Sequence, residues 1–252
     1  MNKLEISLEA ASDRGLVREN NEDMILVGHE TLRSDMITKT ATVIGGERYL
    51  VALADGMGGH KGGDVASEMM LRNLDTFFYD ITPDLSNDDL IDSFFTWLAS
   101  VNRCINGRGR EDANLRGMGT TLVAFIVYNQ KFFWANCGDS RLYRVRDGEI
   151  RQLTTDHSLD MLTGLKSDSN VLLNCIGGCC QDSYLDILQM DDVRQGDIYI
   201  LCSDGLTDMV EDDQLLTYIT QGASAADIVK AANDAGGFDN ISVSIVKIDQ
   251  LD

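Results

Sequence analysis

Residues 49–60 read YLVALADGMGGH and combine a strand pattern with a carboxylate and a group of glycines. Residues 49–54 form an apolar run that ends at Asp55-Gly56, which is typical of a strand followed by a turn. Asp55 is therefore placed at the end of a strand. Glycines beside it allow the backbone to approach a ligand or metal ion closely. The stretch predicts a strand that presents a carboxylate at the rim of a sheet.

More strands of the same kind are predicted on both sides of this one. Runs rich in Val, Ile, Leu and aromatic residues occupy residues 121–127, 131–135, 142–146, 150–153, 197–202 and 241–246. Asp147-Gly148 lies between two of these runs and is a strong hairpin signal, because both turn positions need positive φ. Asn129-Gln130 predicts another tight turn. Strands joined so closely must be antiparallel.

Helices are predicted between and after the strands. Apolar residues recur at helical spacing over residues 65–78 and 90–105, so each segment has one stripe that would cover a sheet face. Ser224 and Asp227 have the spacing of a capping box, which predicts a helix over 225–235, and a shorter helix is expected near 213–220. Hairpins with segregated helices favour an α+β fold built in layers. Without a linker-like segment, residues 1–252 are expected to form a single domain.

The charge of the chain is strongly negative. Forty-one acidic residues against 21 basic residues give a formal net charge of −20. Such a surface repels nucleic acid and anionic membranes, so neither is expected as a partner. Most of these acids serve solubility in the simplest interpretation, and a minority are candidates for metal ligands.

The ends and the cysteines indicate a reducing compartment. The N-terminal residues lack the apolar region of a signal peptide, and no apolar run is long enough to span a membrane. The six cysteines are therefore expected to be reduced thiols in the cytoplasm. Cys175, Cys179 and Cys180 lack the spacing of a zinc or redox site, and we expect them to be buried free thiols.

Other acidic residues also border predicted strands. Glu22 and Asp23 precede the apolar run 24–27, Asp204 follows the run 197–202, and Asp239 precedes the run 241–246. Asp139 lies between two strands. If neighbouring strands bring these positions to one rim of the sheets, their carboxylates converge.

Converging carboxylates repel one another, and a divalent cation relieves the repulsion. The candidate ligands are all oxygens, and the chain has only three histidines, His29, His60 and His157. Oxygen ligands select Mg²⁺ or Mn²⁺ over Zn²⁺. Asp-Gly and Asp-Asn pairs also mark ordinary turns. From composition and spacing alone, a turn role and a metal role both stay open for each acid.

Several segments together resemble the PPM, or type 2C, family of metal-dependent protein serine/threonine phosphatases in its bacterial form. They are residues 12–23, 54–60 with Gly62 and Gly63, 117–121, 136–141 with 153–158, 201–206 and 237–242. Each is weak alone, but they occur in the family's order and cover nearly the whole chain. The resemblance implies a four-layer αββα sandwich, in which two antiparallel sheets face each other with helix pairs outside. It also implies a site at one end of that sandwich.

The resemblance assigns ligands for two metal ions. Asp55 matches the carboxylate that bridges both ions. Asp204 and Asp239 match ligands of the first ion, and Glu22 and the carbonyl of Gly56 match ligands of the second.

Further roles follow from the same resemblance. Asp23 matches a residue that holds water on the second ion, and Arg18 matches the residue that grips the substrate phosphate. Asp139 and Asp208 match acids that bind an additional ion in some bacterial members, with a turn or cap role as the alternative. Arg141 is expected to be a structural partner. Thr120 and Thr121 are expected to support the site through hydrogen bonds.

The implied activity is hydrolysis of phosphoserine and phosphothreonine on proteins by a water molecule that two Mn²⁺ or Mg²⁺ ions activate. The implied partners are phosphorylated proteins, namely a serine/threonine kinase or its targets, and a monomer is expected. A catalytically silent regulator of the same fold that binds phosphoproteins is the alternative, although such members would be expected to lose acidic ligands. An unrelated calcium module is disfavoured because the chain has no D-x-D-x-D-G loop.

The sequence departs from the family pattern at several places. Met57 stands where eukaryotic members often carry a histidine that could act as the general acid, so the proton donor is unassigned. The flap segment, residues 159–170, is short. The segment 28–48 is long and is interpreted as a loop extension, with a hairpin or docking surface as the alternative.

Overall fold

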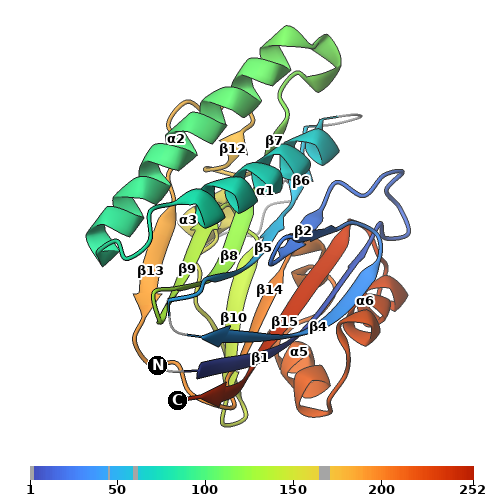
Figure 1. The fold of residues 1–252 in the computed structure, drawn as a ribbon. Coiled ribbons are helices and arrows are strands. Elements are labelled where there is room, and N and C mark those ends of the chain that lie inside the picture. Colours follow the sequence, from blue (N-terminus) through green and yellow to red (C-terminus); the bar gives the residue numbers. More distant parts are fainter. Residues whose placement is uncertain (1–2, 45, 59–61, 165–170) are drawn as a thin grey trace.

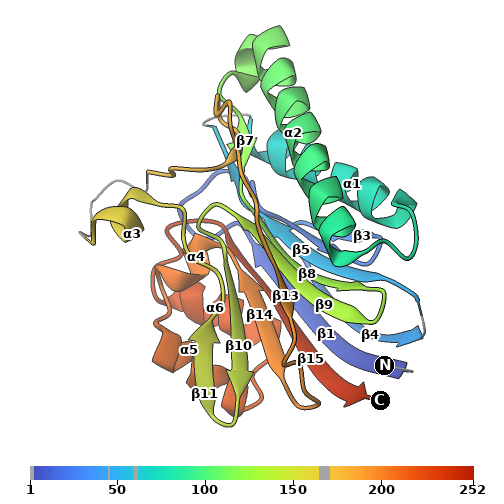
Figure 2. The same cartoon turned by 90° about the vertical axis from the view of Figure 1, so that its left-hand side faces the viewer.

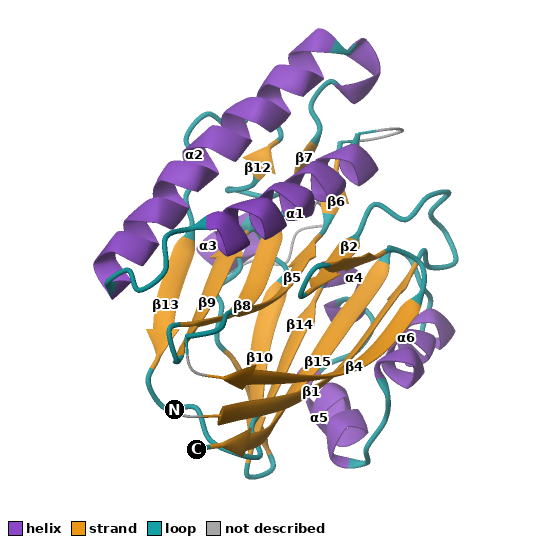
Figure 3. Ribbon diagram, in the orientation of Figure 1, coloured by secondary structure: helices purple, strands orange, loops and turns teal. Residues whose placement is uncertain are grey.

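The computed structural model describes residues 3–44, 46–58, 62–164 and 171–252. It contains two six-stranded antiparallel sheets that lie face to face (Figures 1 and 3). The first has the order β11 (Glu149–Gln152), β10 (Arg141–Arg146), β14 (Ile198–Cys202), β15 (Ile241–Leu251), β1 (Lys3–Asp13) and β4 (Met36–Ile44). The second has the order β13 (Asp186–Met190), β9 (Lys131–Cys137), β8 (Leu122–Tyr128), β5 (Tyr49–Ala54), β2 (Met24–Val27) and β3 (Glu30–Leu32).

Helices cover the outer face of each sheet (Figure 2). The long helices α1 (Gly63–Asp80) and α2 (Asn87–Glu111) lie over the second sheet. The first sheet is covered by α4 (Asp204–Thr207), α5 (Asp212–Thr220) and α6 (Ala225–Asp234). The short α3 (Leu159–Thr163) stands off the body, and the 3-10 turn η1 (Ala113–Leu115) follows α2. A small sheet of β12 (Ile176–Gly177), β7 (Gly119–Thr120) and β6 (Gly56–Met57) completes the described structure.

Three apolar layers hold these elements together: one between the sheets, and one beneath each set of helices. Strand β5 contributes to two of them. Leu50 and Ala52 pack toward α1 and α2, whereas Val51 and Leu53 pack toward the facing sheet. Successive side chains point to opposite faces of a strand, so a strand buried on both faces needs an unbroken apolar run. The predicted α+β sandwich of four layers is thereby confirmed.

The strands predicted from apolar runs are all present, with ends shifted by a few residues. Residues Asn129, Gln130 and Asp147 have φ of 50°, 62° and 52°, which confirms both predicted tight turns. The helices over 65–78, 90–105, 213–220 and 225–235 are also present as α1, α2, α5 and α6. The capping box of Ser224 and Asp227 is formed in both directions.

The interpretation of residues 28–48 as a loop extension is wrong. This segment contains β3 and the edge strand β4, which pairs with β1 from Lys3–Ile44 to Ala11–Met36. Strand β4 is exposed along one side and carries Lys and Thr, so it lacks the apolar run that marked the interior strands. Such polar edges are common because they discourage pairing with other chains.

The cysteines near β12 differ from the expectation, and the flap segment lies partly outside the described residues. Cys175 is buried, but Cys179 is exposed and Cys180 is intermediate, because both lie in the loop that follows β12. The short flap begins with α3, and residues 165–170 lie outside the described part of the chain. No described helix is long and apolar enough to cross a membrane.

Candidate metal centre

A cavity of about 530 Å³ lies where the strands of both sheets end. It gathers seven of the residues predicted for the site: Arg18, Glu22, Asp55, Gly56, Asp139, Asp204 and Asp239. The pairing of the strands accounts for this convergence. Met24 is opposite Ala54, so Glu22 arrives beside Asp55, and Cys202 is opposite Val243, so Asp204 arrives beside Asp239.

The backbone at Asp55 is fixed by two threonines. The Asp55 amide donates to Thr121 Oγ1 at 3.0 Å, and the Asp55 carbonyl accepts from Thr121 N and Thr120 Oγ1, both at 2.9 Å. Thr121 Oγ1 also contacts Ser140 Oγ at 2.7 Å, next to Asp139. The threonines therefore occupy the backbone groups of Asp55 and leave its carboxylate directed to the cavity. This is the supporting arrangement expected of them.

Close packing of backbone places Glu22 and Gly56. A Cβ atom added to Gly56 would lie 2.1 Å from the carbonyl oxygen of Gly63 and 2.6 Å from that of Glu22. Such contacts leave no space for any other residue at position 56. Ser67 Oγ donates to the Glu22 carbonyl at 2.6 Å, which ties the Glu22 segment to α1.

Asn240 and Arg33 organise the site, although no sequence pattern indicated a role for either. Asn240 Oδ1 accepts from the Glu22 amide at 2.8 Å, while its Nδ2 donates to the carbonyls of Arg14 and Asn20. Arg33 Nη1 donates to the Asn21 carbonyl at 2.6 Å, and its Nη2 donates to α1. The asparagine lies in the motif 237–242, which was its only sequence signal. Arg33 lies in the segment that was interpreted as a loop extension.

Arg18 lies on the cavity wall and pairs with Asp239. Its Nη2 is 2.5 Å from Asp239 Oδ2, and the Arg18 side chain is 53% exposed. The other Asp239 oxygen accepts from the Asn240 amide at 2.8 Å. Arg18 is the one basic side chain among the described residues that line this cavity. A single guanidinium therefore faces several carboxylates.

The carboxylates hold protons more tightly than usual. Burial, together with repulsion from the neighbouring acids, raises the pKa of Asp55 and of Asp204. Burial and the charge of Asp156 raise the pKa of Asp139 to about 6. Burial and the charge of Asp64 raise the pKa of Glu22. All these shifts arise first from burial and then from neighbouring negative charge.

The donor set fits a hard divalent cation. Asp204 Oδ1 and Asp23 Oδ1 are buried oxygens that accept no hydrogen bond. Buried acceptors without a partner are costly, and a cation would satisfy the one at the cavity wall. All the acidic side chains here offer oxygen, as Mg²⁺ and Mn²⁺ prefer. Within the described residues, no three acidic, histidine or cysteine side chains already close around one point, so the individual ligand roles belong to the proposal below.

Two predicted site residues do not line the cavity. Asp23 is fully buried behind it, where Ser203 Oγ donates to Asp23 Oδ2 at 2.8 Å. Burial raises the pKa of Asp23 to about 6, although that hydrogen bond lowers it. Asp208 is at the C-terminal end of α4, close enough for its charge to raise the pKa of Asp139 and Asp204.

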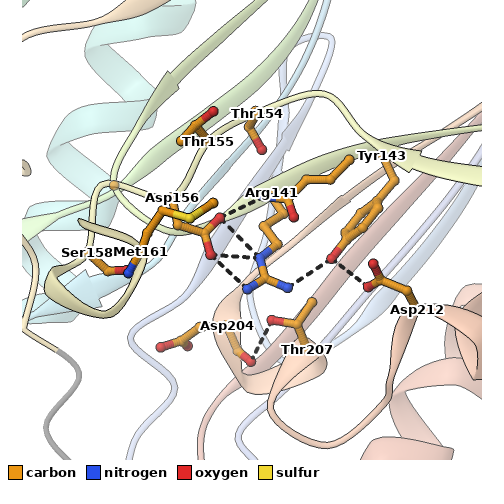
Figure 4. A network of polar contacts seen from close by, with 12 residues as sticks. Arg141, Tyr143, Thr154, Thr155, Asp156, Ser158, Met161, Asp204, Thr207 and Asp212 are labelled. Carbon is orange, nitrogen blue, oxygen red and sulfur yellow. Dashed lines mark hydrogen bonds and ion pairs between the residues drawn. The ribbon is translucent and has the colours of Figure 1, made fainter. Parts of the chain in front are cut away.

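Arg141 anchors a polar network beside α4 (Figure 4). Its Nη2 lies 2.7 Å from Asp156 Oδ2, and its Nη1 donates to the Tyr143 hydroxyl at 3.0 Å. The Tyr143 hydroxyl donates in turn to Asp212 Oδ1 at 3.0 Å. In the same view, Asp204 begins α4 immediately next to this network. Arg141 therefore acts as a structural partner, as expected, because it joins Asp156 to Tyr143.

Comparisons with known proteins agree with this fold and cavity. The family model of protein phosphatase 2C matches residues 29–234. The phosphatase PhpP of Streptococcus pneumoniae is 34% identical over 99% of both chains. A serine/threonine phosphatase structure from S. agalactiae has a TM-score of 0.81 and 29% identity, and covers 96% of this chain and 99% of that one. The PstP catalytic domain in complex with two manganese ions has a TM-score of 0.76 and 30% identity, and covers 98% and 100%.

The layered fold and the acid-lined cavity at its end define a metal-dependent protein phosphatase. More particularly, the chain belongs to the protein phosphatase 2C, or PPM, family, in its bacterial form. The family and the class of enzyme predicted from the sequence motifs are thus confirmed.

Proposed function

We propose that this chain hydrolyses phosphoserine and phosphothreonine on proteins with two Mn²⁺ or Mg²⁺ ions bound in the acid-lined cavity. The observation that carries the proposal is the meeting of Asp55, Asp204, Asp239 and Glu22 in one cavity with a single guanidinium. The relatives named as serine/threonine phosphatases support the substrate class. The PstP structure with two manganese ions supports the metal and the number of ions.

The carboxylates would divide between the two ions as the resemblance implies. Asp55 would bridge them, Asp204 and Asp239 would hold the first, and Glu22 with the Gly56 carbonyl would hold the second. When bound, the ions supply Lewis acidity, which activates water near neutral pH and neutralises charge on phosphoryl oxygens.

Arg18 would bind the substrate phosphate. A guanidinium can donate two parallel hydrogen bonds to a phosphate, and the exposed Arg18 side chain is accessible from solvent. Its charge would stabilise the phosphoryl group most strongly as negative charge spreads over the equatorial oxygens. Met57 offers no proton and His60 lies outside the described residues, so the protein group that protonates the leaving oxygen is unassigned.

Asp23, Asp139 and Asp208 would have supporting roles. Asp23, buried behind the cavity, would orient a water on the second ion. Asp139 and Asp208 would contribute to a third ion, since Asp139 lines the cavity and the charge of Asp208 acts on it. We further propose that residues 1–252 act as one domain and as a monomer on a serine/threonine kinase or its targets.

The proposal is tested by phosphate release from a phosphothreonine peptide with and without Mn²⁺. Asp204→Ala should lower kcat by about 100-fold or more, because it removes a proposed ligand of the first ion, and the charge of that ion would stabilise the transition state. Asp213→Ala is the matched control, since Asp213 is an exposed acid on α5. Release that depends on Mn²⁺ and is lost only in Asp204→Ala supports the two-metal enzyme. Folded wild-type protein that binds the peptide without releasing phosphate would instead support a silent phosphoprotein-binding regulator.

A further inference from the structure

A second cavity of about 530 Å³ opens beside the C-terminal end of α2. Its walls come from α2, from the turn that leads to β7, and from the loop after β12. The residues that matter here are Asn106, Arg110, Glu111, Arg116, Met118 and Cys179. None of them belongs to the acid-lined cavity.

The two cavities are neighbours. Gly58 lines the first and Met118 lines the second. A Cβ atom added to Gly58 would lie 2.8 Å from Met118 Cα and 3.2 Å from the Gly117 carbonyl oxygen. The backbone of residues 117–118 is therefore in direct contact with the wall of the first cavity. A polypeptide that occupied both cavities would cross this contact.

Hydrogen bonds fix the walls of the second cavity. Asn106 Nδ2 donates to the Cys180 carbonyl at 2.9 Å, and Asn106 Oδ1 accepts from the Cys179 amide at 3.0 Å. One turn earlier, Asn102 Oδ1 accepts from the Gly177 amide at 2.7 Å. These bonds attach β12 and the loop after it to α2, so the cavity is a formed feature of the fold.

The charge around this cavity is opposite to that of the whole chain. Four exposed arginines occur within 14 residues: Arg103, Arg108, Arg110 and Arg116. Within the described residues, none of the four makes an ion pair or a side-chain hydrogen bond. This is unexpected in a chain with 41 acidic residues, whose acids could easily have paired with them.

A purely structural explanation covers only part of this group. Arg108 and Arg110 lie in the last turn of α2, where cations favourably offset the helix dipole. Arg116 is at the C-terminal end of η1, which is a single 3-10 turn of three residues and not a long helix. Arg110 and Arg116 both line the cavity, and Glu111 is the one acid among the described residues that line it.

We propose that this cavity is an anion subsite, in which Arg110 and Arg116 bind a second phosphate, or a carboxylate in its place, on the same substrate polypeptide. The inference rests on the proposed function, because the first phosphate must occupy the acid-lined cavity. Two guanidinium groups with free donors suit a phosphate, which accepts paired hydrogen bonds. The subsite selects substrates with two phosphates, or with acidic residues near the scissile phosphate.

Steady-state kinetics test the selection. Three series of phosphothreonine peptides are compared, in which a second position, moved stepwise along the peptide, carries phosphoserine, Glu or Ala. Wild-type protein should show its lowest KM for a phosphoserine peptide of suitable spacing, an intermediate KM for Glu and the highest KM for Ala. Arg110→Gln with Arg116→Gln should raise the KM of the best peptide by on the order of fivefold, with kcat and the KM of the Ala peptide unchanged. Arg151→Gln, on β11, is the matched control.

Cys179 gives a readout that does not depend on catalysis. It is an exposed thiol on this cavity, whereas Cys104 is an exposed thiol outside it. The doubly phosphorylated peptide should slow maleimide labelling of Cys179 but not of Cys104, as measured by peptide mass spectrometry, and the double variant should lose this protection.

The possible results separate the two proposals. Hydrolysis of the Ala peptide shows that the proposed function holds, whatever the subsite does. If that activity is present but the phosphoserine, Glu and Ala peptides have equal KM at every spacing and Cys179 is not protected, the subsite proposal is wrong. If no peptide is hydrolysed by folded protein, the proposed function is wrong, and Cys179 labelling alone decides whether the cavity binds anions.

Discussion

The side chain of Asn240 joins three points of the N-terminal segment to the start of β15. Its oxygen accepts from the Glu22 amide, and its nitrogen donates to the carbonyls of Arg14 and Asn20. Asn240 is buried, so these groups have no ready access to water. One amide therefore holds the loop that carries both Arg18 and Glu22 against the Asp239 side of the cavity.

Substitution Asn240→Ala should weaken both the fold and the site. It leaves three backbone groups without their hydrogen-bond partner. One buried group without a partner lowers the free energy of unfolding by about 1–3 kcal/mol. Urea denaturation measures this loss. A Mn²⁺ titration of activity should show weaker metal affinity, with half-maximal activity at a higher Mn²⁺ concentration than for wild type. Gln221→Ala, at an exposed position after α5, should change neither quantity. An Asn240→Ala protein with wild-type stability and metal affinity would contradict the role given to this amide.

The buried acids also predict how stability depends on pH. Burial raises the pKa of Asp23 and Asp139 to about 6 from the ordinary value of 3.8. The folded protein then binds more protons than the unfolded chain, so each acid makes the unfolding free energy fall as pH rises from about 4 to about 6. In EDTA, urea denaturation at pH 4.5 and 6.5 should show a smaller fall for Asp23→Asn than for wild type. Equal falls in the two proteins would show that Asp23 is not the group that titrates.

At the scale of elements, the connection between β9 and β10 carries Asp139 and is held by His157. The Gly138 amide and Asn174 Nδ2 both donate to His157 Nδ1, at 3.2 and 2.8 Å. Because Nδ1 accepts, the ring proton is assigned to Nε2, which lies 3.1 Å from Asp186 Oδ2. One buried ring thus connects the β9–β10 turn, the loop before β12 and the start of β13.

Substitution His157→Phe should destabilise the protein by about 1–3 kcal/mol, because Asn174 and the Gly138 amide lose a buried acceptor. Thermal unfolding measures the effect. His29→Phe is the matched control, since His29 is 66% exposed and its removal leaves no buried group unpaired. Comparable losses in both variants would mean that the buried hydrogen bonds of His157 are not responsible.

The elements that the sequence could predict are those whose signal is local. Residues 49–54 are apolar throughout because both faces of β5 are buried, and the end of this strand was predicted to the residue. Strand β1 has no unbroken apolar run: Leu4, Ile6 and Leu8 alternate with polar residues, which is the signal of a half-buried strand and was overlooked. Strand β4 was missed because it is a polar edge. The roles of Asn240 and Arg33 depend on contacts between segments far apart in the chain, which spacing does not reveal.

At the scale of the whole molecule, a protein of net charge −20 must bind an anionic substrate. The attraction comes from short-range contacts inside the cavity, whereas the repulsion comes from charge spread over the surface. Salt screens the surface repulsion more than the attraction inside the cavity, because the Debye length is about 10 Å at 0.1 M. The KM of a phosphothreonine peptide should therefore stay within about threefold between 20 and 200 mM NaCl. A steep rise of KM with salt would contradict this balance.

Strands β1 and β15 lie side by side among the interior strands of the first sheet, paired from Leu4–Leu251 to Asp13–Ile241. Residues near the two ends of the described chain also meet in the cavity, as Arg18 and Asp239 do. Contacts between such distant residues close late and slow folding. During synthesis, β15 must emerge from the ribosome before it can pair with β1. We therefore expect a nascent chain to hold no competent metal centre until β15 has emerged, so that dephosphorylation cannot begin before this strand is in place.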